Sequence, residues 1–280
     1  MKGLVHIIKS VIYRVGVDVL RFYWNIIGGR RVTVFGENII LLPTTVFPSF
    51  WNLRLPTGGA TSRICRYGDY VQMHSMVGYV SELKYPAVVI DIGAHHGAYA
   101  IVLGKILQKT GGRIIAIEPN PLSFAVLERN VSLNGLNDTV YCERVAVSDR
   151  AGEIHISMHD VQSQISDQQS SESVSVDMVT LSFLMEKYKI DSVDVLQIDV
   201  EGAELPVLNG FPWKIGKVGK IYCELHPYAW SDFHYTGKDV QQFIEEHNMQ
   251  CFDMYLNEHK TFEGLAYIGP TVFISQPEPN

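Results

Sequence analysis

The sequence predicts an α/β fold in which helices cover both faces of one doubly wound, mostly parallel sheet. From residue 88 onward, short apolar runs alternate with helical patterns, which is typical of parallel strands joined by crossover helices. The first run, residues 88–92, is rich in Val and Ile, as expected of a central strand buried on both faces. It leads directly into a glycine-rich turn and a helix, which together form the nucleotide-binding corner of such a sheet.

The turn after this first core strand has the pattern Asp91-x-Gly93-x-x-x-Gly97. Glycines here let a ligand approach the backbone closely. The middle glycine of a dinucleotide fingerprint is replaced by His95, and this turn lacks the Lys-Ser or Lys-Thr pair of a P-loop. An acid before the turn repels a pyrophosphate but suits a cation such as S-adenosylmethionine (SAM), which carries a sulfonium and an ammonium group. A buried turn with purely structural glycines is the alternative interpretation.

The other elements of the sheet are predicted from periodicity and turn residues. The predicted strands are residues 113–118, 140–147, 152–157, 192–199, 220–225, 251–256 and 266–275, the last of them antiparallel. The predicted helices are residues 98–108, 121–134, the part of 176–188 that follows a strand end, a short helix within 201–210, and 238–248. Residues 162–175 are dense in Ser, Gln and Asp and are predicted to form a mobile surface loop.

The region before the first core strand is expected to form an N-terminal extension, residues 1–84, of a single domain at 85–280. Alternating residues on both sides of Gly36 predict a β-hairpin from 32 to 42. Residues 43–56 are rich in proline and aromatic residues and are predicted to be irregular. Residues 62–83 are predicted to be mostly helical and to cover one edge of the sheet.

Residues 1–27 are apolar and aromatic but are interrupted by Lys9, Arg14, Asp18 and Arg21. The segment is too charged to span a bilayer and lacks a small-residue cleavage site, so we expect neither a transmembrane helix nor a signal peptide. One interpretation is an amphipathic helix packed on the domain. The other is a helix that attaches the protein to an anionic membrane surface, or to a second copy of itself.

Charge and cysteine content limit the class of protein. The formal net charge of −7, without any basic run, argues against a nucleic-acid partner bound through its phosphates. The four cysteines are dispersed and form no C-x-x-C motif. They are typical of reduced residues in a cytosolic protein and provide no zinc framework.

Ionisable residues follow four of the predicted core strands. These residues are Asp91, Glu118, Asp199 with Glu201, and His226. The carboxyl ends of parallel strands meet at the edge where ligands bind, and carboxylates gathered there repel one another unless a cation binds. An acid that ends the second strand can accept hydrogen bonds from both ribose hydroxyls, the role expected for Glu118. Ser148 and Asp149, after the third strand, could approach an adenine edge, although the same residues are also good turn formers.

Seven segments are similar to those of a known family. They are DIGAHHGAY at 91–99, AIEPNP at 116–121, LERNVSLNGL at 127–136, VAVSD at 145–149, VTLSFL at 179–184, QIDVEGAELPVLNG at 197–210 and ELHP at 224–227. The chain resembles the FkbM-type methyltransferases, a branch of the SAM-dependent Rossmann-like enzymes. The resemblance implies a seven-stranded methyltransferase sheet, SAM as cofactor, and acceptor hydroxyls on sugars or natural products.

The resemblance also implies the cofactor site. Its residues would be Asp91, Gly93, Ala94, His95, Gly97, Tyr99, Glu118, Pro119, Asn120, Ala146, Ser148 and Asp199. Three departures from the family pattern stand out: His95 replaces the usual Asn, Gln197 replaces a frequent Lys, and residues 70–74 lack the acids often found upstream of the first core strand.

The expected activity is SAM-dependent O-methylation of a glycan or a small hydroxylated acceptor. His226, Asp199 and Glu201 are the expected catalytic residues, with His226 as general base and the carboxylates orienting its ring. Alternatively, His226 only ends its strand. The competing functions are a non-catalytic SAM- or nucleoside-binding protein and a nicotinamide-dependent reductase, which the missing glycine disfavours. A metal-dependent mechanism of the catechol type through Asp199 and Glu201 is conceivable, but spacing alone establishes no metal site, and we assign no metal ligand.

Overall fold

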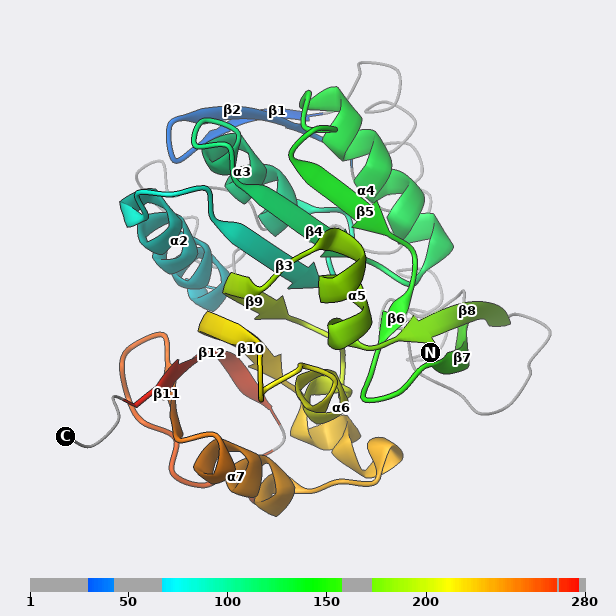
Figure 1. The fold of residues 1–280 in the computed structure, drawn as a ribbon, viewed down its shortest axis with the longest axis vertical. Helices are drawn as coiled ribbons and strands as arrows, with labels where there is room; N and C mark the ends of the chain where they lie inside the picture. The colour runs from blue at the N-terminus through cyan, green and yellow to red at the C-terminus, as the bar shows by residue number, and fades with distance from the viewer. Residues whose placement is uncertain (1–29, 43–66, 158–172, 266, 277–280) are drawn as a thin grey trace, which may run out of the picture.

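The computed structural model describes residues 30–42, 67–157, 173–265 and 267–276 of the 280-residue chain (Figure 1). The predictions for residues 1–27 and 43–56, for residues 62–66 of the predicted helical stretch, and for residues 162–172 of the surface loop lie outside these ranges.

The core is a seven-stranded sheet with the strand order β11-β12-β10-β9-β3-β4-β5. Its strands are β3 (Val88–Ile92), β4 (Arg113–Ile117), β5 (Val140–Glu143), β9 (Ser192–Ile198), β10 (Lys217–Leu225), β11 (Met249–Asp253) and β12 (Ile268–Ser275). The pairs from β5 across to β10 are all parallel, whereas β12 is antiparallel to both β10 and β11. The predicted doubly wound, mostly parallel sheet with an antiparallel closing strand is therefore confirmed.

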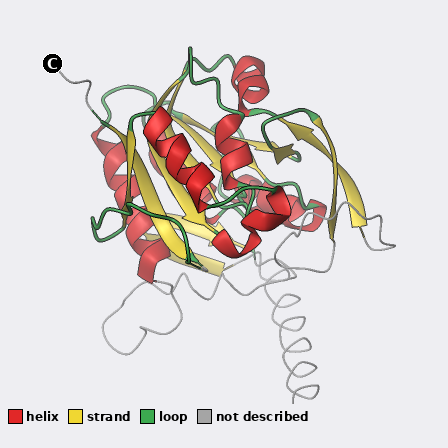
Figure 2. Cartoon of the chain, turned by 90° about the horizontal axis from the view of Figure 1, so that it is seen from below, coloured by secondary structure: helices red, strands yellow, loops and turns green. Residues whose placement is uncertain are grey.

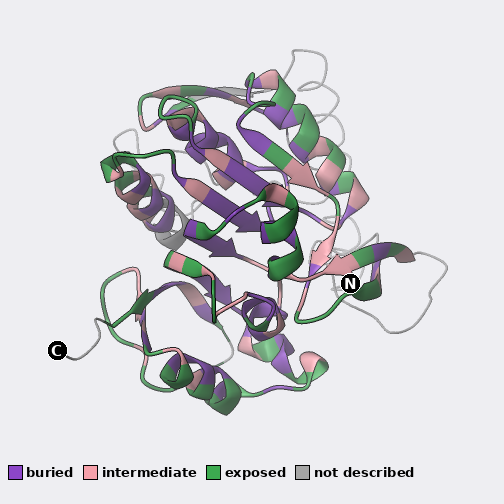
Figure 3. Ribbon diagram, in the orientation of Figure 1, coloured by how far each residue is buried: buried purple, intermediate pink, exposed green. Residues whose placement is uncertain are grey.

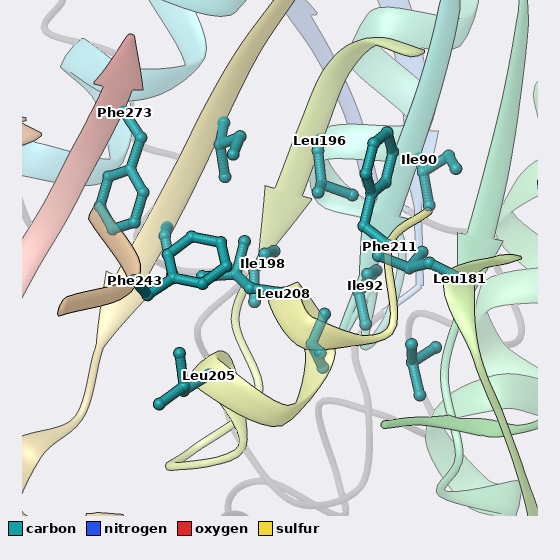
Figure 4. Packing of buried hydrophobic residues seen from close by; sticks show 14 of the residues in the cluster. Ile90, Ile92, Leu181, Leu196, Ile198, Leu205, Leu208, Phe211, Phe243 and Phe273 are labelled. Carbon is teal, nitrogen blue, oxygen red and sulfur yellow. The ribbon is translucent and has the colours of Figure 1, made fainter. Parts of the chain in front are cut away.

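Helices cover both faces of this sheet, as Figures 1 and 2 show. One face packs against α2 (Tyr67–Glu82), α3 (Ala98–Leu107) and α4 (Pro121–Leu133), and the other against α5 (Leu181–Tyr188), α6 (Glu204–Asn209) and α7 (Gly237–Glu246). Because side chains alternate along a strand, Val89 belongs to the first of these two cores and Ile90 and Ile92 to the second. Figure 4 shows the second core, and Figure 3 shows that the central strands are almost wholly buried.

The predicted hairpin is present as β1 (Arg30–Val34) and β2 (Glu37–Leu41) and is fixed to α4 by two asparagines. Asn134 accepts a hydrogen bond from the backbone N–H of Ile40 at 2.8 Å, and its amide donates to the carbonyl of the same residue. Asn130 makes the corresponding pair of bonds with Leu42. These side chains satisfy backbone groups of β2 that would otherwise be buried without a partner.

Two predictions in the middle of the chain are wrong. The strand predicted at 140–147 is interrupted: β5 ends at Glu143, and β6 (Ala146–Val147) joins β7 (Gly152–Ser157) and β8 (Ser173–Val179) in a separate three-stranded sheet. No glycine or proline marks the break, so the local pattern carried no signal of it. Residues 173–175 of the predicted loop belong instead to β8, because they pair in antiparallel register with β7.

None of the helices that the structure describes is long and apolar enough to cross a membrane. Cys142, Cys223 and Cys251 are free thiols, as the sequence predicts.

Candidate active site

The strand order reverses beside β3, which has β4 on one side and β9 on the other. Ligands of open α/β sheets bind outside the carboxyl ends of the strands at such a switch point. The turn after β3 and the residues that follow β9 and β10 therefore flank the expected site.

The turn after β3 is held closely against the neighbouring strands. The N–H groups of Gly93 and Ala94 both donate to the carbonyl of Ile117, at 2.9 Å. Gly93 has a φ of 80°, and a Cβ atom there would lie 1.8 Å from the backbone oxygen of Asp199. Gly97 has a φ of 87° and begins α3. Both glycines are therefore required by the protein itself, and their presence alone does not identify a ligand.

Asp91 supplies a buried acid beneath this turn. Its side chain is 1% exposed, and its Oδ2 atom has no hydrogen-bond partner. Burial, and next the carboxylate of Glu118, raise the pKa of Asp91 to about 7. A buried carboxylate oxygen without a partner is costly, and a cationic donor placed beside it would remove that cost.

Glu118 is fixed by backbone groups at the end of β4. Its Oε2 accepts from the N–H of His95 at 2.8 Å, and its Oε1 accepts from the N–H of Asn120 at 2.9 Å. Burial raises the pKa of Glu118 to about 7, against the lowering effect of these two bonds. Each carboxylate oxygen can accept a second hydrogen bond, so Glu118 retains acceptor capacity for further donors. We call Asp91 and Glu118 the cofactor-side pair.

His95 adopts a left-handed backbone conformation, with a φ of 51°. Asn and His enter this region more readily than most other residues, which accounts for His95 at a position where the family usually has Asn. The ring stacks edge-on with that of His96, with 3.0 Å between the two Nδ1 atoms. Burial lowers the pKa of His95 to about 4 and that of His96 to about 3, so both rings are neutral and leave the charge of the acids uncompensated.

The other predicted cofactor residues lie on three elements. Asn120 caps α4 through its Oδ1, which accepts from the N–H of Leu122 at 2.9 Å. Ser148 follows β6 and bonds to Asp149 and to the carbonyl of Val179. Within the described ranges, no hydrogen bond joins Ser148 to the cofactor-side pair. The remaining three residues are Tyr99 in the first turn of α3, Pro119 directly after Glu118, and Ala146 in β6.

A second ionisable group lies after β9 and β10. His226 is 3% exposed, and its Nδ1 is 2.8 Å from Oε1 of Glu204. Its Nε2 faces three further acids, at 3.5 Å from Glu201, 3.7 Å from Glu224 and 3.9 Å from Asp199. We call His226 and these four acids the His226 cluster. The structure thus brings together the three predicted catalytic residues.

The acid that holds the imidazole ring is Glu204, which the sequence analysis did not single out. Glu204 is 1% exposed, and besides the histidine it accepts from the N–H of Gly202, the indole of Trp230 and the hydroxyl of Tyr235. Neither Asp199 nor Glu201 makes a hydrogen bond of normal length to the ring. The DVEGAE and ELHP segments contain Glu204 and Glu224, but only the fold shows that both face His226.

The pKa values in the His226 cluster are shifted because four carboxylates lie close to one imidazole ring. Burial lowers the pKa of His226, but the carboxylates of Glu204 and Glu224 outweigh it and raise the pKa to about 10. Burial and the charge of Glu224 raise the pKa of Asp199 well above its ordinary value. The hydroxyl of Tyr228 donates to Glu201 and that of Tyr267 to Glu224, with both rings next to the imidazole.

The fold is that of a Rossmann-like methyltransferase. Residues 91–251, more than half of the chain, match the family model described as the methyltransferase FkbM domain. The chain therefore belongs to the FkbM methyltransferase family. SAM is the cofactor that this membership implies, and the buried acids fit it: Oδ2 of Asp91 lacks a donor, and Glu118 retains acceptor sites.

Two curated relatives share part of the sequence. Hexuronic acid methyltransferase AglP of Haloferax volcanii is 26% identical over 184 residues, which cover 65% of this chain and 72% of AglP. Methyltransferase sdnD of Sordaria araneosa is 24% identical over 164 residues, which cover 47% of this chain and 62% of sdnD.

Among solved structures, two methyltransferases are similar at lower identity. The FkbM methyltransferase of Methylobacillus flagellatus KT has a TM-score of 0.42 and 15% identity, covering 69% of this chain and 44% of that one. The O-methyltransferase of Bacillus cereus, solved in complex with SAH, has a TM-score of 0.41 and 11% identity, with coverages of 78% and 82%.

Proposed function

We propose that this methyltransferase uses SAM to methylate a hydroxyl group of a glycan or a small natural product. The observation that carries the proposal is the meeting of two groups at one strand edge: the cofactor-side pair and the His226 cluster. Contact between the Gly93 turn and the backbone of Asp199 joins the two. The name of AglP, a hexuronic acid methyltransferase, agrees with an acceptor of this class.

In this proposal the cofactor-side pair binds and orients the cofactor. Asp91 pairs with the ammonium end, and Glu118 accepts from the ribose hydroxyls. When bound, SAM supplies an electrophilic methyl group on a sulfonium. Both acids are held by the fold before any ligand arrives, so little ordering is needed on binding.

The His226 cluster lines the acceptor side and accepts the proton that the acceptor hydroxyl loses. As the acceptor oxygen bonds to the methyl carbon, the carbon–sulfur bond breaks with its electron pair on sulfur. Because the surrounding carboxylates raise the pKa of His226 to about 10, the imidazole is protonated at neutral pH, and the hydroxyl proton goes to Asp199 or Glu201, which lie 3.9 Å and 3.5 Å from Nε2. Methyl transfer is an in-line displacement, so proximity and orientation supply much of the rate and a general base adds to it.

The direct test is transfer of label from methyl-labelled SAM to a panel of glycans, including hexuronic acid-containing ones, and small hydroxylated compounds. The proposal predicts labelled product and release of S-adenosylhomocysteine with at least one acceptor. A thermal-shift comparison provides the control: SAM should stabilise the protein, and NAD should not. Stabilisation by NAD alone would instead favour a reductase, and SAM binding without turnover on any acceptor would favour a non-catalytic binding protein.

A further inference from the structure

We propose that Asp199, Glu224 and His226 form a binding site for one divalent metal ion. The site would lie on the acceptor side of the methyl-transfer centre, so its catalytic role rests on the proposed function, whereas ion binding itself does not. From the sequence, a metal at Asp199 and Glu201 was conceivable, but no ligand was assigned because spacing alone establishes no metal site, and Glu224 was not singled out.

The distances among the three side chains fit a shared ion. One ligand atom from each residue lies within 4.8 Å of the others. The imidazole Nε2 is 3.9 Å from Oδ1 of Asp199 and 3.7 Å from Oε1 of Glu224. Donors on an ion with bonds of about 2.0–2.2 Å are about 3.0–3.5 Å apart, so small side-chain movements would close the site. Asp199 can make such a movement, since its side chain is 39% exposed.

The orientation of His226 provides an independent observation. Its Nδ1 is fixed by Glu204, which is itself held by three other donors. This is the carboxylate–histidine arrangement that orients metal-binding imidazoles and leaves Nε2 as the ligand atom. The residue is almost fully buried, and its Nε2 points at three acids, 3.5–3.9 Å away, which is farther than a hydrogen bond of normal length.

The charge around this point also favours a cation. In the described ranges, no Lys or Arg forms an ion pair with Asp199, Glu201 or Glu204, whereas His226 is paired with all three. Several carboxylates around one imidazole repel one another, and a divalent ion would offset that repulsion.

The donor set indicates the kind of ion and its use. One imidazole nitrogen with two carboxylates suits a first-row ion such as Mn²⁺, Fe²⁺ or Zn²⁺ better than Mg²⁺ or Ca²⁺, which prefer oxygen donors. Three protein ligands leave coordination positions for acceptor oxygens. An ion there would orient the acceptor and lower the pKa of its hydroxyl. With His226 and Asp199 engaged on the ion, Glu201 becomes the residue that takes the proton.

The test is Mn²⁺ titration of the metal-stripped full-length protein, followed by the electron paramagnetic resonance signal of free Mn²⁺. We expect one saturable site per chain, with affinity at least about tenfold weaker in Asp199→Asn and in Glu224→Gln. The matched control is Glu263→Gln, which removes an exposed acid paired with Lys238, far from the cluster in sequence, and should bind Mn²⁺ as the wild type does.

Calorimetric titration of SAM into each variant establishes that it is folded and keeps the two proposals separate. Absence of a saturable Mn²⁺ site in a protein that binds SAM would overturn the metal site and leave the methyltransferase proposal standing. Equal Mn²⁺ affinity in the wild type and both ligand variants would also overturn it. Conversely, a saturable site lost in the variants, without methyl transfer to any acceptor, would support the metal site and count against the proposed reaction.

Discussion

The cofactor-side pair and the His226 cluster solve the problem of buried acids in different ways. Asp91 and Glu118 are separated from solvent, and backbone N–H groups hold Glu118 while Asp91 keeps an unpartnered oxygen. In the His226 cluster, side chains from two strand ends and a short helix bond to one another, and an imidazole lies among the acids. The first group is therefore suited to holding a cationic ligand, and the second to exchanging a proton or binding an ion.

Gly93→Val should have the largest effect, because it disrupts the contact that joins the two groups. The new Cβ would meet the Asp199 carbonyl at 1.8 Å, and φ is 80°. We expect loss of SAM binding and a decrease of more than about 3 kcal/mol in the free energy of unfolding, measured by denaturant titration.

Gly135→Val is the matched control for this substitution. Gly135 also has a positive φ, 64°, but a Cβ there meets nothing within 4 Å. In this variant the free energy of unfolding should fall by about 1–2 kcal/mol, because of conformational strain alone, and the affinity for SAM should be unchanged. Equal losses in both variants would show that backbone strain, and not the contact with Asp199, dominates at Gly93.

His226→Ala tests whether the His226 cluster acts in methyl transfer and not in SAM binding. Because this residue is placed on the acceptor side, we expect kcat for methyl transfer to fall about 10²–10⁴-fold, while the calorimetric affinity for SAM stays within about twofold. His226→Gln, which keeps more of the side-chain volume, should show the same pattern. Turnover near the wild-type rate would remove His226 from the chemistry and leave it with only a structural role before Pro227.

Glu118→Ala tests the opposite group. Removing charge-assisted hydrogen bonds to the ribose should cost about 1.5–3 kcal/mol, or at least about tenfold in SAM affinity by calorimetry. Glu118→Gln keeps the shape and one acceptor oxygen, so it should lose less. Unchanged affinity in both variants would contradict the assignment of this residue to the cofactor.

The pH dependence of SAM binding should follow the cofactor-side pair. Burial raises the pKa values of Asp91 and Glu118 to about 7, so the folded, ligand-free protein holds protons that the unfolded chain has lost. The stability from these groups is thus present at low pH and falls as the pH rises through 7. A cationic ligand prefers the ionised acids, so SAM affinity should rise by about three- to tenfold from pH 6 to pH 8.

Asp91→Asn is the variant that checks the origin of this dependence. It should bind SAM more weakly and should flatten both the affinity profile and the stability profile between pH 6 and pH 8. A profile as steep as that of the wild type would assign the dependence to another residue.

The cofactor-side pair was predictable from sequence because its parts are local. A buried β-branched strand, an acid and two glycines occur within one short stretch, and Glu118 ends the next strand. The position of each acid is determined by the strand on which it lies or which it follows. The parallel register of β3 and β4 then brings the two acids to one edge of the sheet.

The His226 cluster was predictable only in part. Asp199, Glu201 and His226 were identified as strand-end residues, but Glu204 and Glu224 have roles that depend on how α6 and β10 pack together. Spacing along the chain does not contain that geometry. The break between β5 and β6 was missed for a similar reason, since pairing with the distant strand β8, and not a local turn residue, determines it.

The central claim is that the two groups divide the work of one reaction, cofactor binding on one side and acceptor chemistry on the other. Its most direct test is to measure SAM affinity and S-adenosylhomocysteine release together, in Glu118→Ala and His226→Ala. The account predicts weakened SAM binding in Glu118→Ala, with turnover recovered in part at saturating SAM, and normal SAM binding with lost turnover in His226→Ala. The reverse pattern, or equal loss of SAM affinity in both variants, would contradict it.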